Sequence, residues 1–398
     1  MSPAEGPPPT PLGGDPEGVR ARLGLGDRPL LDFAASLNPL GPPSMALAAA
    51  RAALDRVDRY SPPGSPRLVE RLAADHGLPT DRVIVGAGTT ELIGLIAQSL
   101  RDVLALHARE TGEPNRPVAH LVEPTHGEYR RASVLNGLRT QAWKDHVLGW
   151  AQGDFPRSAV GLFWTGHPDN PTGRAWDRDR LLPLVDGSRG LLTVVDESFL
   201  PFLPDEPDRT LAGAVATRDN LLVLRSLTKV YALAGLRVGY ALASPELIAR
   251  LRQYQNPRAV SAPAEAAALA ALDDPRYLHL TRSLTAAEAV RVTGLLWDLP
   301  GLRPAWPDRD RPPTAPPMPN YVLTSVTAPH LTSAQVRDGL ARRGFLVREC
   351  SDFPGLEPGS LLTGPDRLVA TRGHLRIALR QPEENDRLIA ALAEVLRT

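Results

Sequence analysis

Six short apolar segments follow one another between residues 82 and 243, and helical patterns separate them. Each segment is continuously apolar rather than alternating, which is typical of strands covered on both faces. Helices between successive strands favour parallel connections. The pattern therefore predicts an α/β fold with a large domain whose mostly parallel sheet lies between helices. The strands are expected at residues 83–85, 119–122, 160–164, 191–195, 221–224 and 238–241.

The pattern changes after two helical stretches at residues 245–253 and 262–272. A long helix is expected near residues 280–297, followed by a proline-dense irregular connection at 304–319. Strands and helices then mix in a smaller α+β unit. We expect a large domain at residues 51–273 and a small domain made of residues 30–50 and 274–398. Within the small domain the expected elements are strands at 321–325, 345–348 and 374–379, and helices at 333–343 and from 382.

The balance of charge limits the classes of partner. Lys plus Arg equals Asp plus Glu at 45 each, so no overall field attracts nucleic acid or an anionic membrane. Residues 1–29 are rich in Pro and Gly, and this composition indicates a flexible tail rather than a signal peptide or membrane anchor.

Cys350 is the only cysteine, which suits a reducing compartment. We expect a cytoplasmic protein with a small-molecule substrate, and no metal site, since the histidines are scattered.

The segment 225–240, RSLTKVYALAGLRVGY, places one lysine among groups that bind anions. A lone lysine after a strand is usually a solvated strand end. Here the hydroxyls of Ser226 and Thr228 and the guanidinium of Arg237 accompany Lys229. Together these donors suit a dianionic phosphate.

Other polar groups follow the expected strands. Asp196 ends the fourth strand and, taken alone, could be a helix cap. Asn170 lies in the segment DNPTG, which alone reads as a turn. Thr89 and Thr90 stand in a glycine-rich loop before a helix, where free N–H groups and hydroxyls make a plausible phosphate site.

In their order and spacing these motifs resemble the class I/II aminotransferases, which have the aspartate-aminotransferase fold and use pyridoxal 5'-phosphate. The resemblance covers nearly the whole chain from Leu31 onward. It implies that Lys229 holds the cofactor as a Schiff base and that Asp196 pairs with the pyridine nitrogen. A carboxylate there keeps the ring protonated and an electron sink. Asn170 would donate to the phenolic oxygen. The phosphate would be held by Ser226, Thr228, Arg237 and the Thr89–Thr90 loop.

Two further positions follow from the resemblance. His126, in the segment EPTHGEY, occupies the place of an aromatic residue that stacks on the cofactor ring, although a loop histidine is the plainer interpretation. Tyr60, in DRYSP, matches a tyrosine that reaches the phosphate of the neighbouring subunit. The match implies a homodimer with shared active sites.

The substrate residues are implied in the same way. Arg376 matches the arginine that grips the substrate α-carboxylate with two parallel hydrogen bonds. Arg348 matches a second arginine, which meets a substrate phosphate in relatives that act on phosphorylated amines. Asn38 is expected to contact substrate. Arg380 should share a face with Arg376 and is expected to be a solvated strand end.

Within this family the chain looks most like histidinol-phosphate aminotransferases and threonine-phosphate decarboxylases. The segments 32–41 and 348–356 and the residue Phe199 resemble the decarboxylases. Leu12 stands where those decarboxylases carry a phosphate-binding histidine, and segments 106–117 and 357–373 are longer than in the relatives.

The bond that breaks is the one held perpendicular to the cofactor ring, and the sequence leaves its identity open. We predict an aminotransferase acting on an amino acid, or on a phosphorylated amino acid or amine. Decarboxylation is the alternative. A ligand-binding relative without catalysis is less favoured, because Lys229, Asp196, Asn170 and Arg237 are all present.

Overall fold

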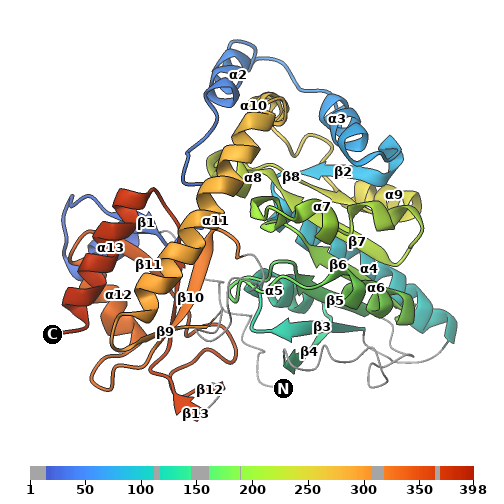
Figure 1. Ribbon diagram of the computed structural model, residues 1–398. Helices are drawn as coiled ribbons and strands as arrows, with labels where there is room; N and C mark the ends of the chain where they lie inside the picture. Colours follow the sequence, from blue (N-terminus) through green and yellow to red (C-terminus); the bar gives the residue numbers. More distant parts are fainter. Residues whose placement is uncertain (1–14, 112–116, 145–160, 189, 306–317, 364–367) are drawn as a thin grey trace.

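The computed structural model of the chain describes residues 15–111, 117–144, 161–188, 190–305, 318–363 and 368–398. The chain forms two lobes, each built around its own sheet (Figure 1). Helix α11 (Pro275–Trp297) extends from the large lobe to the small one. The two-domain arrangement expected from the sequence is therefore present.

The large domain contains a seven-stranded sheet in the order β2-β8-β7-β6-β5-β3-β4. Strands β3 to β7 pair in parallel, whereas β8 is antiparallel to both β2 and β7. Only the short helices α8 (Leu227–Val230) and η5 (Ala234–Leu236) connect β7 to β8, too little chain for a parallel crossover. The strands are β2 (Val83–Gly86), β3 (Val118–Glu123), β4 (Arg139–Lys144), β5 (Gly161–Gly166), β6 (Leu191–Asp196), β7 (Leu221–Ser226) and β8 (Gly239–Leu242).

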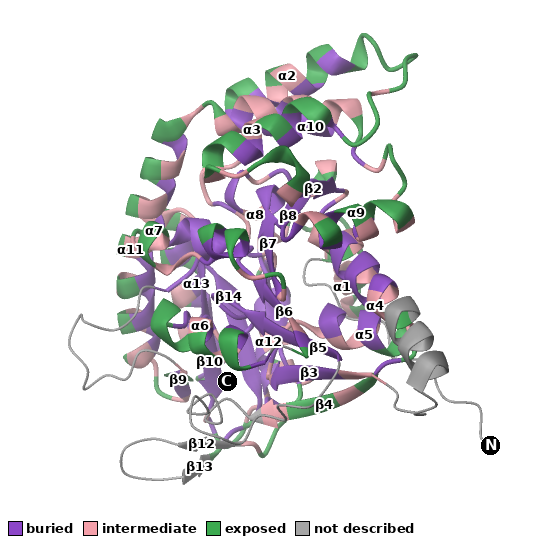
Figure 2. Ribbon diagram, turned by 90° about the vertical axis from the view of Figure 1, so that its right-hand side faces the viewer, coloured by how far each residue is buried: buried purple, intermediate pink, exposed green. Residues whose placement is uncertain are grey.

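Both faces of this sheet are buried beneath helices, as the continuous apolar segments predicted (Figure 2). Val194 and Val195 are fully buried neighbours on β6, and each packs into a different hydrophobic cluster. The sheet therefore has one core on each side. The helices of this domain include α2 (Ser44–Leu54), α3 (Pro66–His76), α4 (Thr89–Thr111), α5 (Gly127–Leu135), α6 (Arg178–Gly187), α9 (Pro245–Tyr254) and α10 (Ala262–Leu272). Helix α2 packs on α10 and so crosses the expected domain boundary at residue 50.

The small domain has a five-stranded sheet in the order β1-β11-β14-β10-β9. Its strands are β1 (Leu31–Phe33), β9 (Leu302–Pro304), β10 (Tyr321–Val326), β11 (Phe345–Glu349) and β14 (His374–Ala378), and its helices are α12 (Ser333–Ala341) and α13 (Pro382–Val395). Helix α11 begins five residues before its expected start. Asp274 caps it by accepting from the Tyr277 N–H at 3.1 Å, and Pro275 suits its first position. Most of the expected irregular connection, residues 306–317, lies outside the described residues.

The N-terminal region is more ordered than its composition predicts. Residues 16–23 form helix α1 (Pro16–Leu23), and Arg22 donates to both carboxylate oxygens of Asp338 on α12, at 2.9 and 2.8 Å. Helix α1 has no buried residue, so apolar periodicity gives no signal for it. The expected flexible tail to residue 29 thus differs from the structure beyond residue 14; residues 1–14 lie outside the described part.

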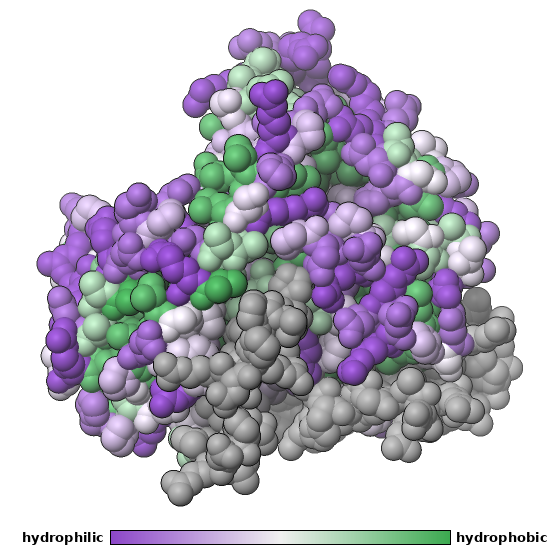
Figure 3. Space-filling model, in the orientation of Figure 1, coloured by the Kyte–Doolittle hydropathy of each residue, from purple (hydrophilic) through white to green (hydrophobic). Residues whose placement is uncertain are grey.

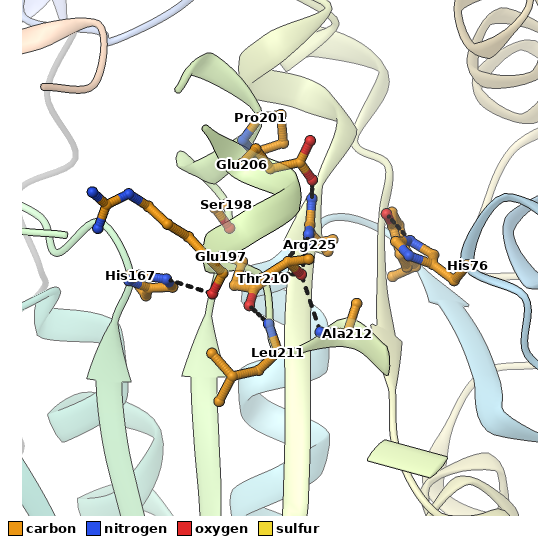
Figure 4. A network of polar contacts seen from close by, with 12 residues as sticks. His76, His167, Glu197, Ser198, Pro201, Glu206, Thr210, Leu211, Ala212 and Arg225 are labelled. Atoms are coloured by element: carbon orange, nitrogen blue, oxygen red, sulfur yellow. Dashed lines mark hydrogen bonds and ion pairs between the residues drawn. The ribbon is translucent and has the colours of Figure 1, made fainter. Parts of the chain in front are cut away.

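A buried ion network joins α11 to the strand ends of the large domain, and Figure 4 shows the part of it formed by Glu197, Glu206 and Arg225. Arg225 is the last residue but one of β7. It has 3% of its surface exposed and lies 2.7 Å from Glu197 and 2.6 Å from Glu206. Arg282, on α11, donates to the other oxygen of Glu206 at 2.5 Å. Buried charges that are paired in this way resist displacement. The network therefore fixes the chain directly beside Asp196 and Ser226.

Candidate active site

A cavity of about 630 Å³ lies where the carboxyl ends of β5, β6 and β7 meet the small domain. In open α/β sheets, ligands bind at this edge because the loops after parallel strands converge there. The cavity brings together ten of the thirteen residues expected in the site from the sequence. These are Thr89, Thr90, His126, Asn170, Asp196, Thr228, Lys229, Arg237, Arg348 and Arg376.

Lys229 stands on α8, directly after β7, and its Nζ lies 6.0 Å from the ring centre of Phe199. Burial lowers the pKa of Lys229 to about 8, and the neighbouring Arg376 and Arg237 act in the same direction while Asp196 opposes them. A lowered pKa provides the neutral amine that a nucleophile requires. The site therefore presents an activated lysine.

Asp196 ends β6 with 7% of its surface exposed. One carboxylate oxygen accepts from the Ser198 N–H at 2.9 Å, and the other accepts from the Tyr129 hydroxyl at 2.8 Å. Burial raises the pKa of Asp196, and these two hydrogen bonds oppose the rise. A hydrogen bond to each of its two oxygens thus fixes the orientation of the Asp196 carboxylate.

Tyr129 was not among the residues singled out in the sequence. It is fully buried on α5, and its ring stacks on Trp164 at 5.1 Å with an angle of 4°. His126 meets the same ring edge to face at 5.4 Å. His126 and Tyr129 are three residues apart at the start of α5, and this spacing places them on the same side of the helix. That spacing is the signal that could have identified Tyr129.

His126 lines the cavity, and its expected stacking on the cofactor ring stays a prediction. Burial lowers its pKa to about 3, and the cations Lys229, Arg376 and Arg348 add to the effect. Its imidazole is therefore neutral across the physiological range. A neutral ring can lie against a protonated pyridine without charge repulsion.

The groups expected to bind phosphate gather around the first turn of α4. Gly88 has φ +82°, and a Cβ there would lie 2.6 Å from Nη2 of Arg237, so only glycine lets the guanidinium approach this closely. Thr89 and Thr90 line the cavity at the helix N-terminus, where free N–H groups favour an anion. Ser226 lies behind them, with its hydroxyl 2.7 Å from that of Thr228. The cluster forms an anion cradle.

The two expected substrate arginines come from the small domain. Arg376 on β14 and Arg348 on β11 are direct cross-strand partners, and both line the cavity. Arg376 donates to the side-chain oxygen of Asn170 and, at 2.7 Å, to the carbonyl of Ala34. Burial lowers the pKa of Arg376, and repulsion from Arg348 adds to it. The contact with Asn170 links the two domains across the cavity.

A second residue that the sequence reasoning missed supports Arg376. Tyr321 is fully buried on β10, and its ring centre lies 5.3 Å from the guanidinium carbon of Arg376. Its hydroxyl donates to the carbonyl of Asp169 at 2.6 Å. No local motif marks this tyrosine, because its partners lie far away along the chain.

Besides Ser226, two further expected site residues, Asn38 and Tyr60, do not line this cavity. Asn38 is buried, and its side-chain amide donates to the carbonyl of Val230 at 2.6 Å and to the Thr281 hydroxyl at 2.7 Å. Tyr60 is 89% exposed, with Arg258 over its ring at 5.0 Å. Their roles toward substrate and cofactor stay predictions. Arg380 is paired rather than free, because it donates to Glu384 at 2.9 Å.

The anion cradle, the amine of lowered pKa, the buried carboxylate and the amide of Asn170 together fit pyridoxal 5'-phosphate. When bound, this cofactor supplies a ring that takes up the electrons of a bond broken at the substrate. The fold and the cavity define a pyridoxal-phosphate enzyme of the aspartate-aminotransferase fold. More narrowly, the chain belongs to the family Aminotransferase class I and II, whose sequence profile matches residues 28–392.

Relatives of two activities resemble the chain over almost its full length. A histidinol-phosphate aminotransferase of Symbiobacterium thermophilum is 33% identical, with 96% of this chain and 94% of that protein covered. A threonine-phosphate decarboxylase of Salmonella typhimurium is 30% identical, with 96% of each covered. Among solved structures, L-threonine-O-3-phosphate decarboxylase from Porphyromonas gingivalis has a TM-score of 0.76 at 22% identity, covering 92% of this chain and 99% of that one. Histidinol-phosphate aminotransferase from Sinorhizobium meliloti, in complex with pyridoxal-5'-phosphate, has a TM-score of 0.75 at 23% identity, covering 99% of both chains.

The described residues contain neither a cluster of metal ligands nor a membrane-spanning helix. Within them, no three His, Cys, Asp or Glu side chains cluster as metal ligands would. Their helices also include none with the length and apolar character needed to cross a membrane.

Proposed function

We propose that the protein transfers an amino group from a small amine or amino acid that carries a second anionic group, as a histidinol-phosphate aminotransferase does. The observation that carries the proposal is that Lys229, Arg376 and Arg348 face one cavity. An amine of lowered pKa thus stands opposite two guanidinium groups. Such a cavity suits a substrate with a reacting amine and anionic groups beside it.

On the large-domain side, the proposed roles follow from position. Lys229 anchors the cofactor and then moves a proton at the substrate α-carbon. Asp196 holds the proton on the pyridine nitrogen, supported by Tyr129. Asn170 donates to the phenolic oxygen. The cofactor phosphate lies in the cradle at the start of α4.

On the small-domain side, Arg376 is proposed to hold the substrate carboxylate and Arg348 a distal phosphate. Both are fork-shaped donors that match these anions. Segment 357–373 lies between the two arginines in the sequence, so the distal part of the site can differ from that of the relatives. Asn38 is proposed to act through the chain beside Lys229, since its N–H donates to the Lys229 carbonyl at 3.1 Å.

Decarboxylation is the second candidate. The similarity to the Salmonella decarboxylase and the segments 32–41 and 348–356 favour it. The presence of Leu12 in place of a phosphate-binding histidine argues against it, although residue 12 lies outside the described residues. The choice depends on whether a Cα–H bond or a carboxylate is held perpendicular to the cofactor ring.

Product analysis separates the two reactions. The holoenzyme is incubated with histidinol phosphate and a 2-oxo acid acceptor, and in parallel with threonine phosphate alone. Amino-group transfer converts the acceptor into its amino acid without release of gas. Decarboxylation releases carbon dioxide from threonine phosphate and needs no acceptor. Carbon dioxide without any amino acid formed from the acceptor would refute the proposed transfer.

We further propose a cytoplasmic homodimer in which Tyr60 enters the cavity of the partner subunit. Exposed apolar side chains support this, because Leu54 (54%), Val57 (71%) and Tyr60 (89%) lie close together in sequence at and after the end of α2. In the space-filling view, apolar side chains gather at the notch between this part of the large domain and the small domain (Figure 3). Such a surface is typical of a subunit interface.

Mixing two defective variants tests the shared site. Lys229→Ala retains Tyr60, and Tyr60→Ala retains Lys229. A hybrid dimer of the two contains one cavity with both residues intact. Activity of the re-associated mixture above the sum of the separate variants supports the proposal. A monomer in sedimentation analysis, or a mixture no more active than its parts, contradicts it.

A further inference from the structure

Arg348 and Arg376 create a problem of charge inside the cavity. They face each other on paired antiparallel strands, and 8% and 6% of their surfaces are exposed. Like charges at directly opposed positions repel, and a buried charge requires a partner. The described side-chain partner of Arg376 is the neutral Asn170. Arg348 instead has a carboxylate partner, Asp352.

The contacts of Arg348 hold its guanidinium in place. One Nη donates to the carbonyl of Glu349, and the other donates to Asp352 at 2.6 Å. The ring of Phe353, which also lines the cavity, lies 5.0 Å from the guanidinium carbon. Backbone and ring therefore keep the arginine at the cavity wall whether or not Asp352 stays bound.

The two partners differ in their access to water. The side chain of Arg348 is 9% exposed, whereas that of Asp352 is 32% exposed and follows the end of β11 in a loop. A carboxylate with this exposure can turn into solvent and regain its hydration. The buried guanidinium has no such alternative. If an anion enters beside Arg348, Asp352 is the group that moves.

We propose that Asp352 is a displaceable counter-ion that sets the selectivity of the cavity for the distal group of the substrate. A neutral distal group leaves the Arg348–Asp352 pair intact. A phosphate monoester takes the place of the carboxylate on Arg348, and Asp352 turns to solvent. This step rests on the proposed function for the identity of the substrate, but the ion exchange itself requires no turnover.

Equilibrium binding of inorganic phosphate to the holoenzyme, measured by calorimetry, tests the exchange. In the holoenzyme the cofactor phosphate would occupy the cradle proposed at α4, which leaves the small-domain arginines Arg348 and Arg376 as sites for added phosphate. Asp352→Asn retains shape and an acceptor for Arg348 but removes the competing charge. We expect phosphate to bind about tenfold more tightly to the Asp352→Asn variant than to the wild type, a difference in binding free energy of about 1.4 kcal/mol. The gain for acetate, which carries one charge, should be smaller.

Two controls assign the effect to this pair. Glu394→Gln neutralises the carboxylate of another arginine pair in the small domain, Arg343–Glu394 at 3.0 Å, and should leave phosphate binding unchanged. Adding Arg348→Ala to the Asp352→Asn variant should abolish the gain. If Asp352→Asn fails to fold, Asp352→Ser removes the same charge with a smaller side chain.

An unchanged or weaker phosphate affinity in the Asp352 variants overturns the inference, as does a gain that survives Arg348→Ala. The proposed function fails separately. If phosphate binding tightens as expected but no amino group is transferred to any acceptor, the proposed function is wrong and the counter-ion role of Asp352 is supported. If phosphorylated substrates are transaminated while Asp352→Asn leaves phosphate affinity unchanged, only the counter-ion role falls.

Discussion

The two walls of the cavity are built in different ways. On the large-domain wall, Asn170, Asp196 and Lys229 stand at or within a few residues of the ends of β5, β6 and β7. Parallel register brings these ends to one edge. On the small-domain wall, Arg348 and Arg376 lie inside antiparallel strands, and their partners come from loops and from the other domain. The first wall follows from local sequence, whereas the second depends on contacts between distant parts of the chain.

This difference predicts how the walls respond to substitution. A change on the large-domain wall should alter the chemistry for every substrate, because those residues are proposed to face the cofactor. A change on the small-domain wall should discriminate between substrates, because those residues are proposed to face the groups that vary. Arg376 belongs partly to both walls, since it donates to Asn170.

The largest effect is expected for Lys229→Ala, which should abolish turnover with every substrate. Borohydride should no longer fix the cofactor to the protein, because the amine proposed as the anchor is gone. Lys144 is the only other lysine in the chain, so Lys144→Ala is the matched control and should still be labelled. Covalent labelling of the Lys229→Ala protein would show that another residue is the anchor.

The same variant should not be less stable as the apoenzyme. The pKa of Lys229 falls from 10.5 to about 8 on folding, so burying the charged amine opposes folding. The destabilisation of the folded state by this charge is fully present below pH 8, and it is lost as the pH rises toward 10.5. Thermal unfolding of the two apoenzymes should therefore show the Lys229→Ala variant at least as stable at pH 7, with the difference shrinking above pH 8.

A second, smaller effect is expected for Asp196→Asn, which should slow kcat by roughly a thousandfold or more, about 4 kcal/mol, while cofactor stays bound. An amide cannot hold the ring proton by charge. Absorbance spectra and equilibrium dialysis report whether the cofactor remains. A kcat close to that of the wild type would remove Asp196 from the proposed role.

The large-domain wall could be predicted from the sequence because its signals are local. Continuous apolar segments located β5 to β7, and a polar motif followed each one, in the order the family uses. The edge strand β4 was missed because its residues are partly exposed and it lacks a continuous apolar segment. The antiparallel direction of β8 was missed as well, because a single strand does not encode the direction of its neighbours.

The supporting contacts could not be predicted in this way. Tyr321 reaches Asp169 across 152 residues, and Arg22 reaches Asp338 across 316. Neither pair leaves a periodic pattern, since each depends on how distant parts of the chain pack against each other. Asp352 is close to Arg348 in sequence, yet only the turn after β11 places its carboxylate on the guanidinium. These hydrogen-bonding partners became known only from the structure.

The third prediction separates the two arginines of the small-domain wall. Arg376→Ala should lower kcat/KM about a hundredfold for amino acids and much less for amines without a carboxylate. Arg348→Ala should penalise phosphorylated substrates and spare unphosphorylated ones. Losing one charge-assisted contact in a closed site costs about 2–3 kcal/mol, which gives this magnitude. Steady-state kinetics with matched substrate pairs measure the split.

Arg380→Ala is the control for that comparison. Arg380 follows β14 on the face expected for Arg376, but it pairs with Glu384 and does not line the cavity. It should leave kcat/KM unchanged for all substrates. Equal losses in Arg376→Ala and Arg348→Ala on every substrate would show that the small-domain wall does not discriminate, and the contrast between the walls would fail.

The smallest effect is expected for Tyr129→Phe. This variant tests whether the hydrogen bond from Tyr129 to Asp196 on the large-domain wall affects kcat. The substitution keeps the ring stacked on Trp164 and removes only the hydroxyl that donates to Asp196 at 2.8 Å. A net hydrogen bond to a charged group contributes about 1.5 kcal/mol, so kcat should fall roughly tenfold with cofactor affinity nearly constant. Without this donor the carboxylate form of Asp196 is less favoured, and its pKa rises further.

The loss in Tyr129→Phe should therefore be greatest at low pH and recover as the pH increases. Tyr240→Phe is the matched control, because that buried hydroxyl bonds to His76 at 2.9 Å, away from the cavity. It should lower thermal stability without changing the pH profile of kcat. If both variants lose only stability, the Tyr129 hydroxyl is structural. A pH-dependent loss confined to Tyr129→Phe would make it a positioning residue for Asp196, and would show that the local wall also depends on a contact its motifs do not reveal.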